Sequence, residues 1–82
     1  MMEIKKEVIE IFDLINNDST VPKNIKQAVS EMDLMIKEKN EDMALKINKI
    51  LQKLEDLTEE NNLPEHTRTQ IWNVASLLES II

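Results

Sequence analysis

The sequence predicts an all-α fold, a compact four-helix domain made of two helical hairpins. Four apolar stripes recur along the 82 residues, with the spacing of three and four that aligns side chains on one face of a helix. The chain has no glycine, no tyrosine and one phenylalanine, so it lacks the residues that β-hairpin turns and aromatic cross-strand pairs use. Neither hairpin can bury its stripes alone, and therefore the two must pack together as a single domain over residues 1–82.

The first helix is expected over residues 3–16. Its stripe consists of Ile4, Val8, Ile11, Phe12 and Ile15. The helix is expected to stop near Asn16 and Asn17, because asparagine can adopt the left-handed conformation that ends many helices.

The second helix is expected over residues 21–38, after a polar turn. Thr20 can cap it, and Pro22 fits its first turn, where the missing N–H is not needed. Its stripe consists of Ile25, Ala28, Val29, Met32, Met35 and Ile36.

The second half of the chain predicts two more helices, over residues 41–58 and 63–81. The first begins with a cap at Asn40 and the carboxylates of Glu41 and Asp42, which suit the positive end of a helix dipole. The segment Asn62–Glu65 resembles a capping box with a proline inside the first turn. The stripe of the third helix is Met43, Ile47, Ile50, Leu54 and Leu57, and that of the fourth is Ile71, Val74, Ala75, Leu77 and Leu78.

Shifting the chain against itself by 42 positions aligns the two halves. Val8 falls on Ile50, Pro22 falls on Pro64, and Lys26 falls on Arg68. A period near 42 with two helices per unit is typical of HEAT-like repeats. Two amphipathic hairpins can also align by convergence, and the packing can be either a closed bundle or a two-repeat stack.

Two segments carry a resemblance to a known family. At Thr20–Lys26 and Leu63–Asn73 the chain closely resembles short archaeal proteins catalogued as uncharacterised protein family 0147. The resemblance covers nearly the whole chain. It implies an archaeal, cytoplasmic, helical protein, and the family has no established activity to carry over.

Composition restricts the classes of partner and cofactor. The formal charge of −6 disfavours nucleic acid, because each phosphate contact needs a lysine or arginine. The absence of cysteine excludes disulfides and thiolate zinc sites, and the absence of glycine excludes a phosphate-binding loop, so no cofactor is expected. No apolar run approaches the ~20 residues of a membrane span, and the charged start is unlike a signal peptide, so a cytoplasmic location is expected.

One polar patch is the best candidate site. Its members are Lys23, Asn24, Lys26, His66 and Arg68, which become neighbours if the two turns meet in the fold. The alternative is a set of solvated first-turn residues, with Arg68 pairing Glu65 or a carboxylate of the third helix. His66 can be a base or a metal ligand, or a surface histidine with local hydrogen bonds. No catalytic or metal-ligating residue is predicted, because Leu63 stands where a Glu-x-x-His iron motif needs glutamate.

The fourth helix predicts an interface. It carries no charge from Thr69 to Leu78, and its apolar residues cover more than one face. Either it lies at the centre of the domain, or Trp72, Ile81 and Ile82 contact a partner, with a homodimer favoured. The function expected is a non-enzymatic helical protein-interaction module that self-associates. The alternatives are an RNA- or ribosome-associated accessory factor that uses the basic residues, and a small enzyme subunit that uses His66.

Overall fold

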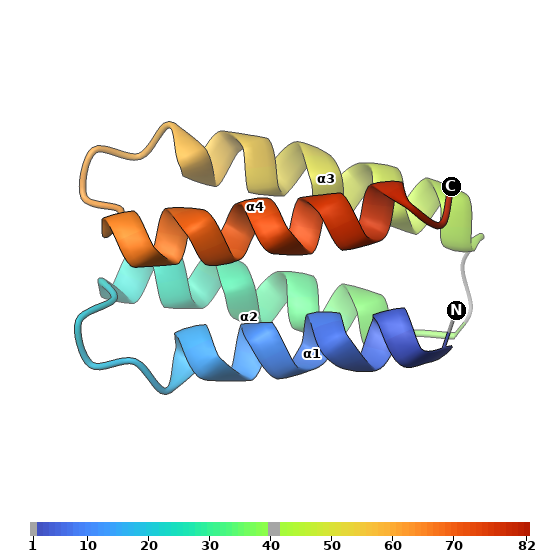
Figure 1. Ribbon diagram of the computed structural model, residues 1–82, viewed down its shortest axis with the longest axis horizontal. Coiled ribbons are helices and arrows are strands. Elements are labelled where there is room, and N and C mark those ends of the chain that lie inside the picture. The colour runs from blue at the N-terminus through green and yellow to red at the C-terminus, as the bar shows by residue number, and fades with distance from the viewer. Residues whose placement is uncertain (1, 40–41) are drawn as a thin grey trace.

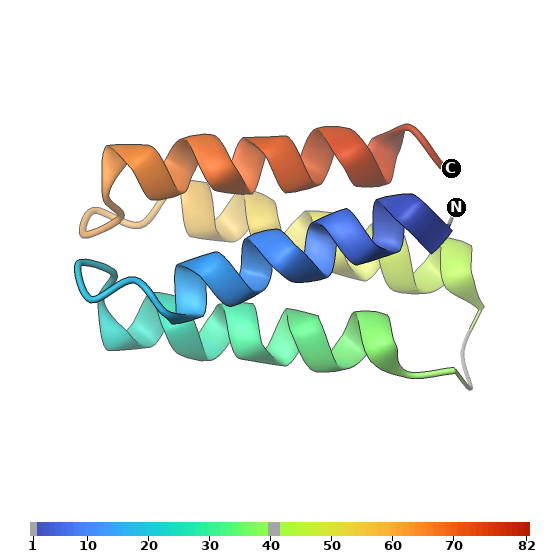
Figure 2. The same cartoon turned by 60° about the horizontal axis from the view of Figure 1, so that its bottom comes forward.

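A computed structural model describes residues 2–39 and 42–82 as four helices aligned along one axis (Figure 1). The helices are α1 (Met2–Asn16), α2 (Lys23–Lys37), α3 (Met43–Thr58) and α4 (Glu65–Glu79). The turn between α1 and α2 and the turn between α3 and α4 lie at one end of the molecule, as Figures 1 and 2 both show. The all-α prediction is confirmed, and the described part of the chain contains no strand.

The helices form a closed ring. α1 contacts α2 and α4, and α3 contacts the same two helices, whereas α1 and α3 are not in contact, nor are α2 and α4. Each helix therefore shares its apolar stripe with two antiparallel neighbours and stands diagonally opposite the fourth helix. The packing that the sequence left open is a four-helix bundle; a HEAT-like relationship between the hairpins stays a prediction.

The predicted stripes meet in one apolar core. Phe12 and Ile15 of α1 are fully buried, as are Met32 of α2 and Ile71 of α4, whereas Leu14, beside the α1 stripe, is 62% exposed. Burying a side chain of this size stabilises the fold by roughly 1.5–3 kcal/mol relative to leaving it exposed. The core thus accounts for the association of the two hairpins.

The 42-residue shift is visible in three dimensions. Every buried position of the first hairpin is buried again 42 residues later, with Thr67 in place of Ile25 as the polar exception. The turns repeat as well: the N–H of Val21 donates to the carbonyl of Asp18 over 3.2 Å, and the N–H of Leu63 donates to the carbonyl of Glu60 over 3.4 Å. We call positions 42 apart equivalent. Because α1 and α3 are diagonal, and so are α2 and α4, the hairpins are related by an approximate two-fold axis along the bundle.

The predicted caps of α2 and α4 are wrong. Both helices begin later than predicted, after Pro22 and Pro64, whose backbones are extended with ψ of 153° and 148°, and neither start has a side-chain cap. The hydroxyl of Thr20 donates to Asp18 instead, and the amide of Asn62 donates to Asn24. Thr20 therefore forms a hydrogen bond within its own turn, and Asn62 joins one hairpin to the other, instead of capping a helix.

The end of α1 lies at the predicted residue, but its predicted conformation is wrong. α1 ends at Asn16 without a left-handed residue, because φ is negative at every described non-glycine residue. The predicted cap at Asn40 and the carboxylate of Glu41 lie outside the described residues. Asp42 is the N-cap of α3, and its carboxylate accepts the N–H of Ala44 over 2.9 Å. None of the described helices combines the length and apolarity that crossing a membrane requires.

Candidate functional site

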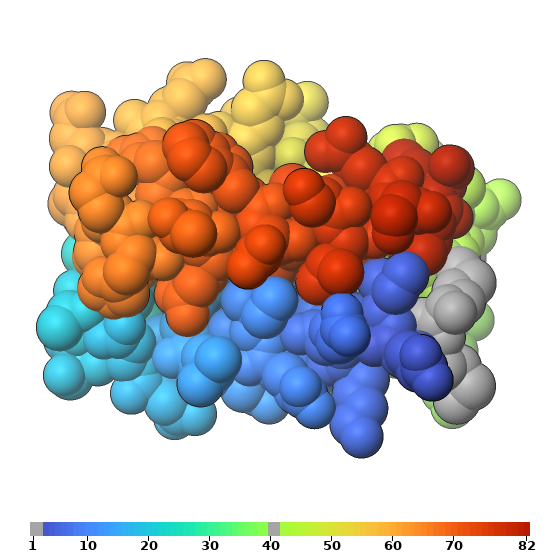
Figure 3. Space-filling model, in the orientation of Figure 1, coloured from blue at the N-terminus to red at the C-terminus, as the bar shows by residue number. Residues whose placement is uncertain are grey.

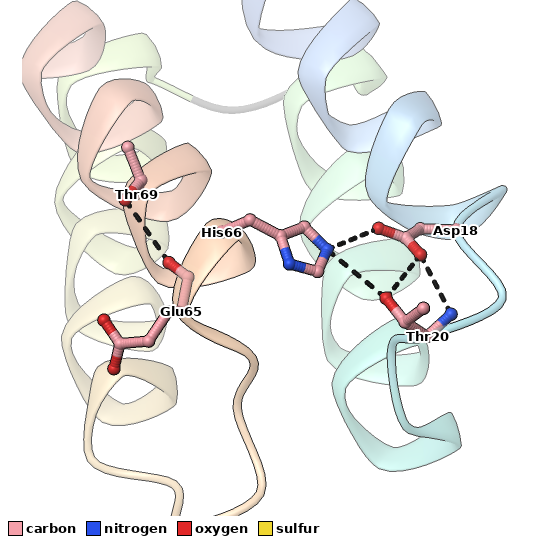
Figure 4. Close-up of polar contacts among 5 residues, drawn as sticks. All are labelled: Asp18, Thr20, Glu65, His66 and Thr69. Atoms are coloured by element: carbon pink, nitrogen blue, oxygen red, sulfur yellow. Dashed lines mark hydrogen bonds and ion pairs between the residues drawn. The ribbon is translucent and has the colours of Figure 1, made fainter.

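His66 joins the start of α4 to the turn between α1 and α2 (Figure 4). Its Nε2 lies 2.7 Å from Oδ2 of Asp18 and 3.3 Å from the hydroxyl of Thr20. The other carboxylate oxygen of Asp18 accepts the Thr20 hydroxyl over 2.6 Å and the Thr20 N–H over 2.9 Å. The His66 side chain is 55% exposed, so the ring stands at the surface of the bundle.

Asp18 is an ionised carboxylate in this cluster. The hydrogen bonds from Thr20, first from its hydroxyl and then from its N–H, and the contact with His66 lower the pKa of Asp18 to about 2. An ionised carboxylate accepts hydrogen bonds and donates none. The cluster therefore acts as a polar tie between the two hairpins at neutral pH.

An equivalent tie lies on the other side of the axis. The 42-residue shift places Thr20 on Asn62 and Asn24 on His66. The side chain of Asn62 donates to Oδ1 of Asn24 over 3.0 Å, so each hairpin turn binds the first turn of the opposite hairpin's second helix. Reasoning from the sequence missed Asp18, Thr20 and Asn62, although the repeat already aligned both pairs.

Two basic side chains cap the C-terminal ends of helices. The guanidinium of Arg68 donates to the carbonyl of Thr58 at the end of α3, and its Nε lies 3.6 Å from Glu65. The ammonium of Lys46, whose residue is 1% exposed, donates to the carbonyl of Glu38 beyond α2. Unpaired carbonyls and the negative end of the helix dipole both favour a cation there.

The predicted basic residues lie on two diagonal helices. Lys23 and Lys26 belong to α2 and Arg68 belongs to α4, and these helices are not in contact. Arg68 is engaged within its own hairpin. The two turns do meet, through the two polar ties. Within residues 2–39 and 42–82, no group of three or more histidine and carboxylate side chains is arranged to hold a metal ion.

Trp72 stands in a groove between α3 and α4. The side chain is 57% exposed, and the groove has a volume of about 540 Å³. Leu51 and Ala75 contribute apolar surface, and Glu55 and Glu79 contribute carboxylates. Of the other two predicted interface residues, Ile82 is 58% exposed, while Ile81 packs against the core. Figure 3 shows α4 lying across the front of the molecule with α1 beside it.

The equivalent surface of the first hairpin is polar. Ser30 occupies the position of Trp72, and its hydroxyl lies 3.4 Å from the side-chain oxygen of Asn16. Asp33 occupies the position of Ala75 and accepts from Lys37 over 3.0 Å, a bond that raises the pKa of Lys37. The same backbone therefore carries either polar or apolar side chains here, and the fold itself does not require Trp72.

The groove between α1 and α4 shows the same contrast. It has a volume of about 340 Å³, and its apolar lining is Ile11, Leu14 and Leu77. The equivalent surface between α3 and α2 carries an ion pair, with Lys53 3.9 Å from Glu31. Both flanks of α4 thus combine apolar side chains with carboxylates, whereas the equivalent flanks of α2 carry the ion pairs Lys37–Asp33 and Lys53–Glu31.

The fold and these surfaces define a small four-helix-bundle protein whose α4 carries no charged side chain from Thr69 to Leu78. The chain belongs to the uncharacterised protein family UPF0147, whose model matches residues 2–81. It is 38% identical over 79 residues to the UPF0147 protein of Methanosarcina acetivorans, covering 96% of this chain and 81% of that one. It is 42% identical over 79 residues to the protein of Archaeoglobus fulgidus, covering 93% and 86%.

Two crystal structures share the fold. One is of a UPF0147 protein from Thermoplasma acidophilum, with a TM-score of 0.93, 27% identity and coverage of 99% of this chain and 95% of that one. The other is of a protein of unknown function, with a TM-score of 0.92, 32% identity and coverage of 99% and 92%. The predicted resemblance to an archaeal all-helical family is confirmed.

Proposed function

We propose that this protein is a cytoplasmic, non-enzymatic protein-interaction module that binds a second copy of itself through the exposed surface of α4. One observation carries the proposal: Trp72 is 57% exposed at a position where the equivalent residue, in the same local fold, is Ser30. Exposing a large aromatic side chain gains nothing for the folded monomer, whereas aromatic residues are enriched at protein interfaces. The exposure of the indole therefore supports a partner that covers it.

Charge favours a second copy of this chain as that partner. Two molecules that each carry a net charge of −6 repel one another, so they approach best through a face without charges. α4 is uncharged from Thr69 to Leu78, a length of about 15 Å at the rise of an α-helix. Two-fold dimers are also the commonest oligomers of soluble proteins.

The other two functions have weaker support. An RNA-binding role needs a cluster of free cations, but Arg68 binds the end of α3 and Glu65, and the net charge is negative. An enzyme based on His66 needs a pocket that positions a substrate, but the ring is half exposed and binds an ionised Asp18.

Sedimentation equilibrium over a range of protein concentrations tests the proposal. We expect a monomer–dimer equilibrium that Trp72→Ser, which installs the residue of the equivalent position, shifts to monomer. Leu34→Ser is the matched control, because Leu34 is 64% exposed on α2, outside the proposed surface, and its equivalent residue is Ser76. A wild-type protein that stays monomeric throughout would overturn self-association.

A further inference from the structure

We infer that the second copy packs antiparallel along α4, about a two-fold axis level with Asn73 and Val74. In this arrangement Trp72 covers the partner's Ala75, and Arg68 forms an ion pair with the partner's Glu79. This inference rests on the proposed function and specifies its interface. The residues that carry it are Arg68, Trp72, Ala75 and Glu79, which we call the α4 stripe. Their spacing of four, three and four aligns them along one side of the helix.

The α4 stripe is complementary to itself. Arg68 and Glu79 lie equally far from its midpoint, and so do Trp72 and Ala75. A two-fold axis through the midpoint exchanges the members of each pair between the two copies, as an isologous interface requires. The axis therefore generates two contacts between Trp72 and Ala75, a large and a small side chain, and two ion pairs between Arg68 and Glu79. Such shape and charge pairing fixes the register of two packed helices.

The position of Glu79 supports this arrangement. Glu79 is exposed and is the last residue of α4, where the negative end of its own helix dipole disfavours a carboxylate. In an antiparallel pair the same carboxylate lies beside the first turn of the partner's α4, where the dipole is positive. The dimer thus gives the Glu79 carboxylate a favourable electrostatic environment.

The equivalent stripe on α2 excludes the same pairing. Its members are Lys26, Ser30, Asp33 and Lys37. An antiparallel pair of α2 helices in this register would place Lys26 against the partner's Lys37, and like charges opposed across an interface are unfavourable. Of the two equivalent faces of the bundle, only the α4 face matches itself.

Arg68 can serve both hairpin and partner. A guanidinium has five N–H donors, and the contacts with Thr58 and Glu65 leave others for a carboxylate of the second copy. The Glu65 side chain is 91% exposed and lies 3.6 Å from Nε, so it competes for the same cation. Glu65→Gln is therefore expected to strengthen the dimer, whereas Glu79→Gln is expected to weaken it.

The register is tested by exchanging the charges of Arg68 and Glu79 and measuring the dimer dissociation constant by sedimentation equilibrium. Glu79→Lys, which installs the residue of the equivalent position, and Arg68→Glu are each expected to weaken the dimer roughly tenfold or more, since they oppose like charges twice. The double variant carries both changes, restores opposite charges and is expected to recover the wild-type dissociation constant within about threefold. Glu38→Lys makes the same change of charge beyond the end of α2 and is expected to leave the dimer unchanged.

A cross-linking measurement keeps the inference falsifiable if Arg68→Glu does not fold. The chain has no cysteine, so each single-cysteine variant carries one thiol. Ala75→Cys is expected to form a covalent dimer with a short bismaleimide, and Leu34→Cys is expected not to. A wild-type dimer without charge rescue and without cross-linking at position 75 would overturn the register while leaving self-association intact. A monomeric wild-type protein would overturn both.

Discussion

Asn24 and His66 occupy equivalent positions, and each binds the turn of the opposite hairpin. Asn24 accepts from Asn62 over 3.0 Å, and His66 contacts Thr20, at the position equivalent to Asn62, over 3.3 Å. The geometry of the tie is thus kept while its chemistry differs, because the hydrogen bonds on the His66 side include the ionised carboxylate of Asp18. This difference makes one of the two ties sensitive to acid.

The Asp18 tie is expected to weaken at low pH. Folding lowers the pKa of Asp18 from 3.8 to about 2, so the ionised form contributes stability above pH 3.8 that is lost as the pH falls through about 2. We expect Asp18→Asn to lower the urea midpoint above pH 3.8, and the difference from wild type to shrink toward pH 2. Thr20→Val, which keeps the backbone N–H, is expected to give a smaller loss. If Asp18→Asn lowered the urea midpoint equally above pH 3.8 and near pH 2, the stabilising role of the ionised Asp18 would be contradicted.

The shared core predicts a large cost for truncating α1. Phe12 is fully buried, and removing its ring leaves a cavity between the hairpins. Phe12→Ala is expected to lower the free energy of unfolding by about 3–5 kcal/mol, measured by urea denaturation. Leu14→Ala, two residues away and 62% exposed in the native protein, is expected to cost about 0.5 kcal/mol or less. Similar costs for the two variants would argue against the core described above.

The buried cation of Lys46 predicts a second stability effect. Lys46→Ala removes the donor to the carbonyl of Glu38 and leaves that end of α2 without this partner. We expect a loss of about 1–3 kcal/mol in the free energy of unfolding. Lys23→Ala is the control, since Lys23 is exposed at the start of α2, and a change within about 0.5 kcal/mol is expected. A neutral Lys46→Ala would show that the cap does not stabilise the fold.

The N-cap of α3 predicts a third effect on stability. Asp42 accepts the N–H groups of Ala44 and Leu45 over 2.9 and 3.4 Å. Asp42→Ala is expected to cost about 1 kcal/mol of unfolding free energy, whereas Asp42→Asn keeps an acceptor and is expected to cost a few tenths. Circular dichroism during thermal unfolding distinguishes the two variants. An equal cost for both would indicate that the charge, rather than the hydrogen bond, matters.

The sequence was sufficient to predict the helices, their buried faces and the repeat. These features depend on the periodicity of residues such as Val8 and Phe12, and periodicity is local. The helix starts were less predictable. Thr20 and Asn62 are ordinary capping residues, but each contacts the opposite hairpin, Thr20 at His66 and Asn62 at Asn24, and no local pattern indicates these contacts. The closed ring was also beyond prediction, because crossing geometry depends on how all four helices pack.

The residues of the predicted polar patch are divided between two places in the structure. His66 and Asn24 do lie where the two turns meet, because their equivalent positions put both at the same end of the bundle. The grouping of Lys23 with Arg68 assumed that neighbouring turns bring neighbouring cations. A long side chain instead extends toward the nearest unpaired carbonyls, and for Arg68 these belong to Thr58 at the end of α3.

The caps formed by Lys46 and Arg68 couple successive helices. The end of α2 is held by a side chain from α3, and the end of α3 by a side chain from α4. We expect a helix end held in this way to fray together with the first turn of the next helix. Amide hydrogens near Glu38 and Lys46 are therefore expected to exchange with solvent in one cooperative event rather than separately.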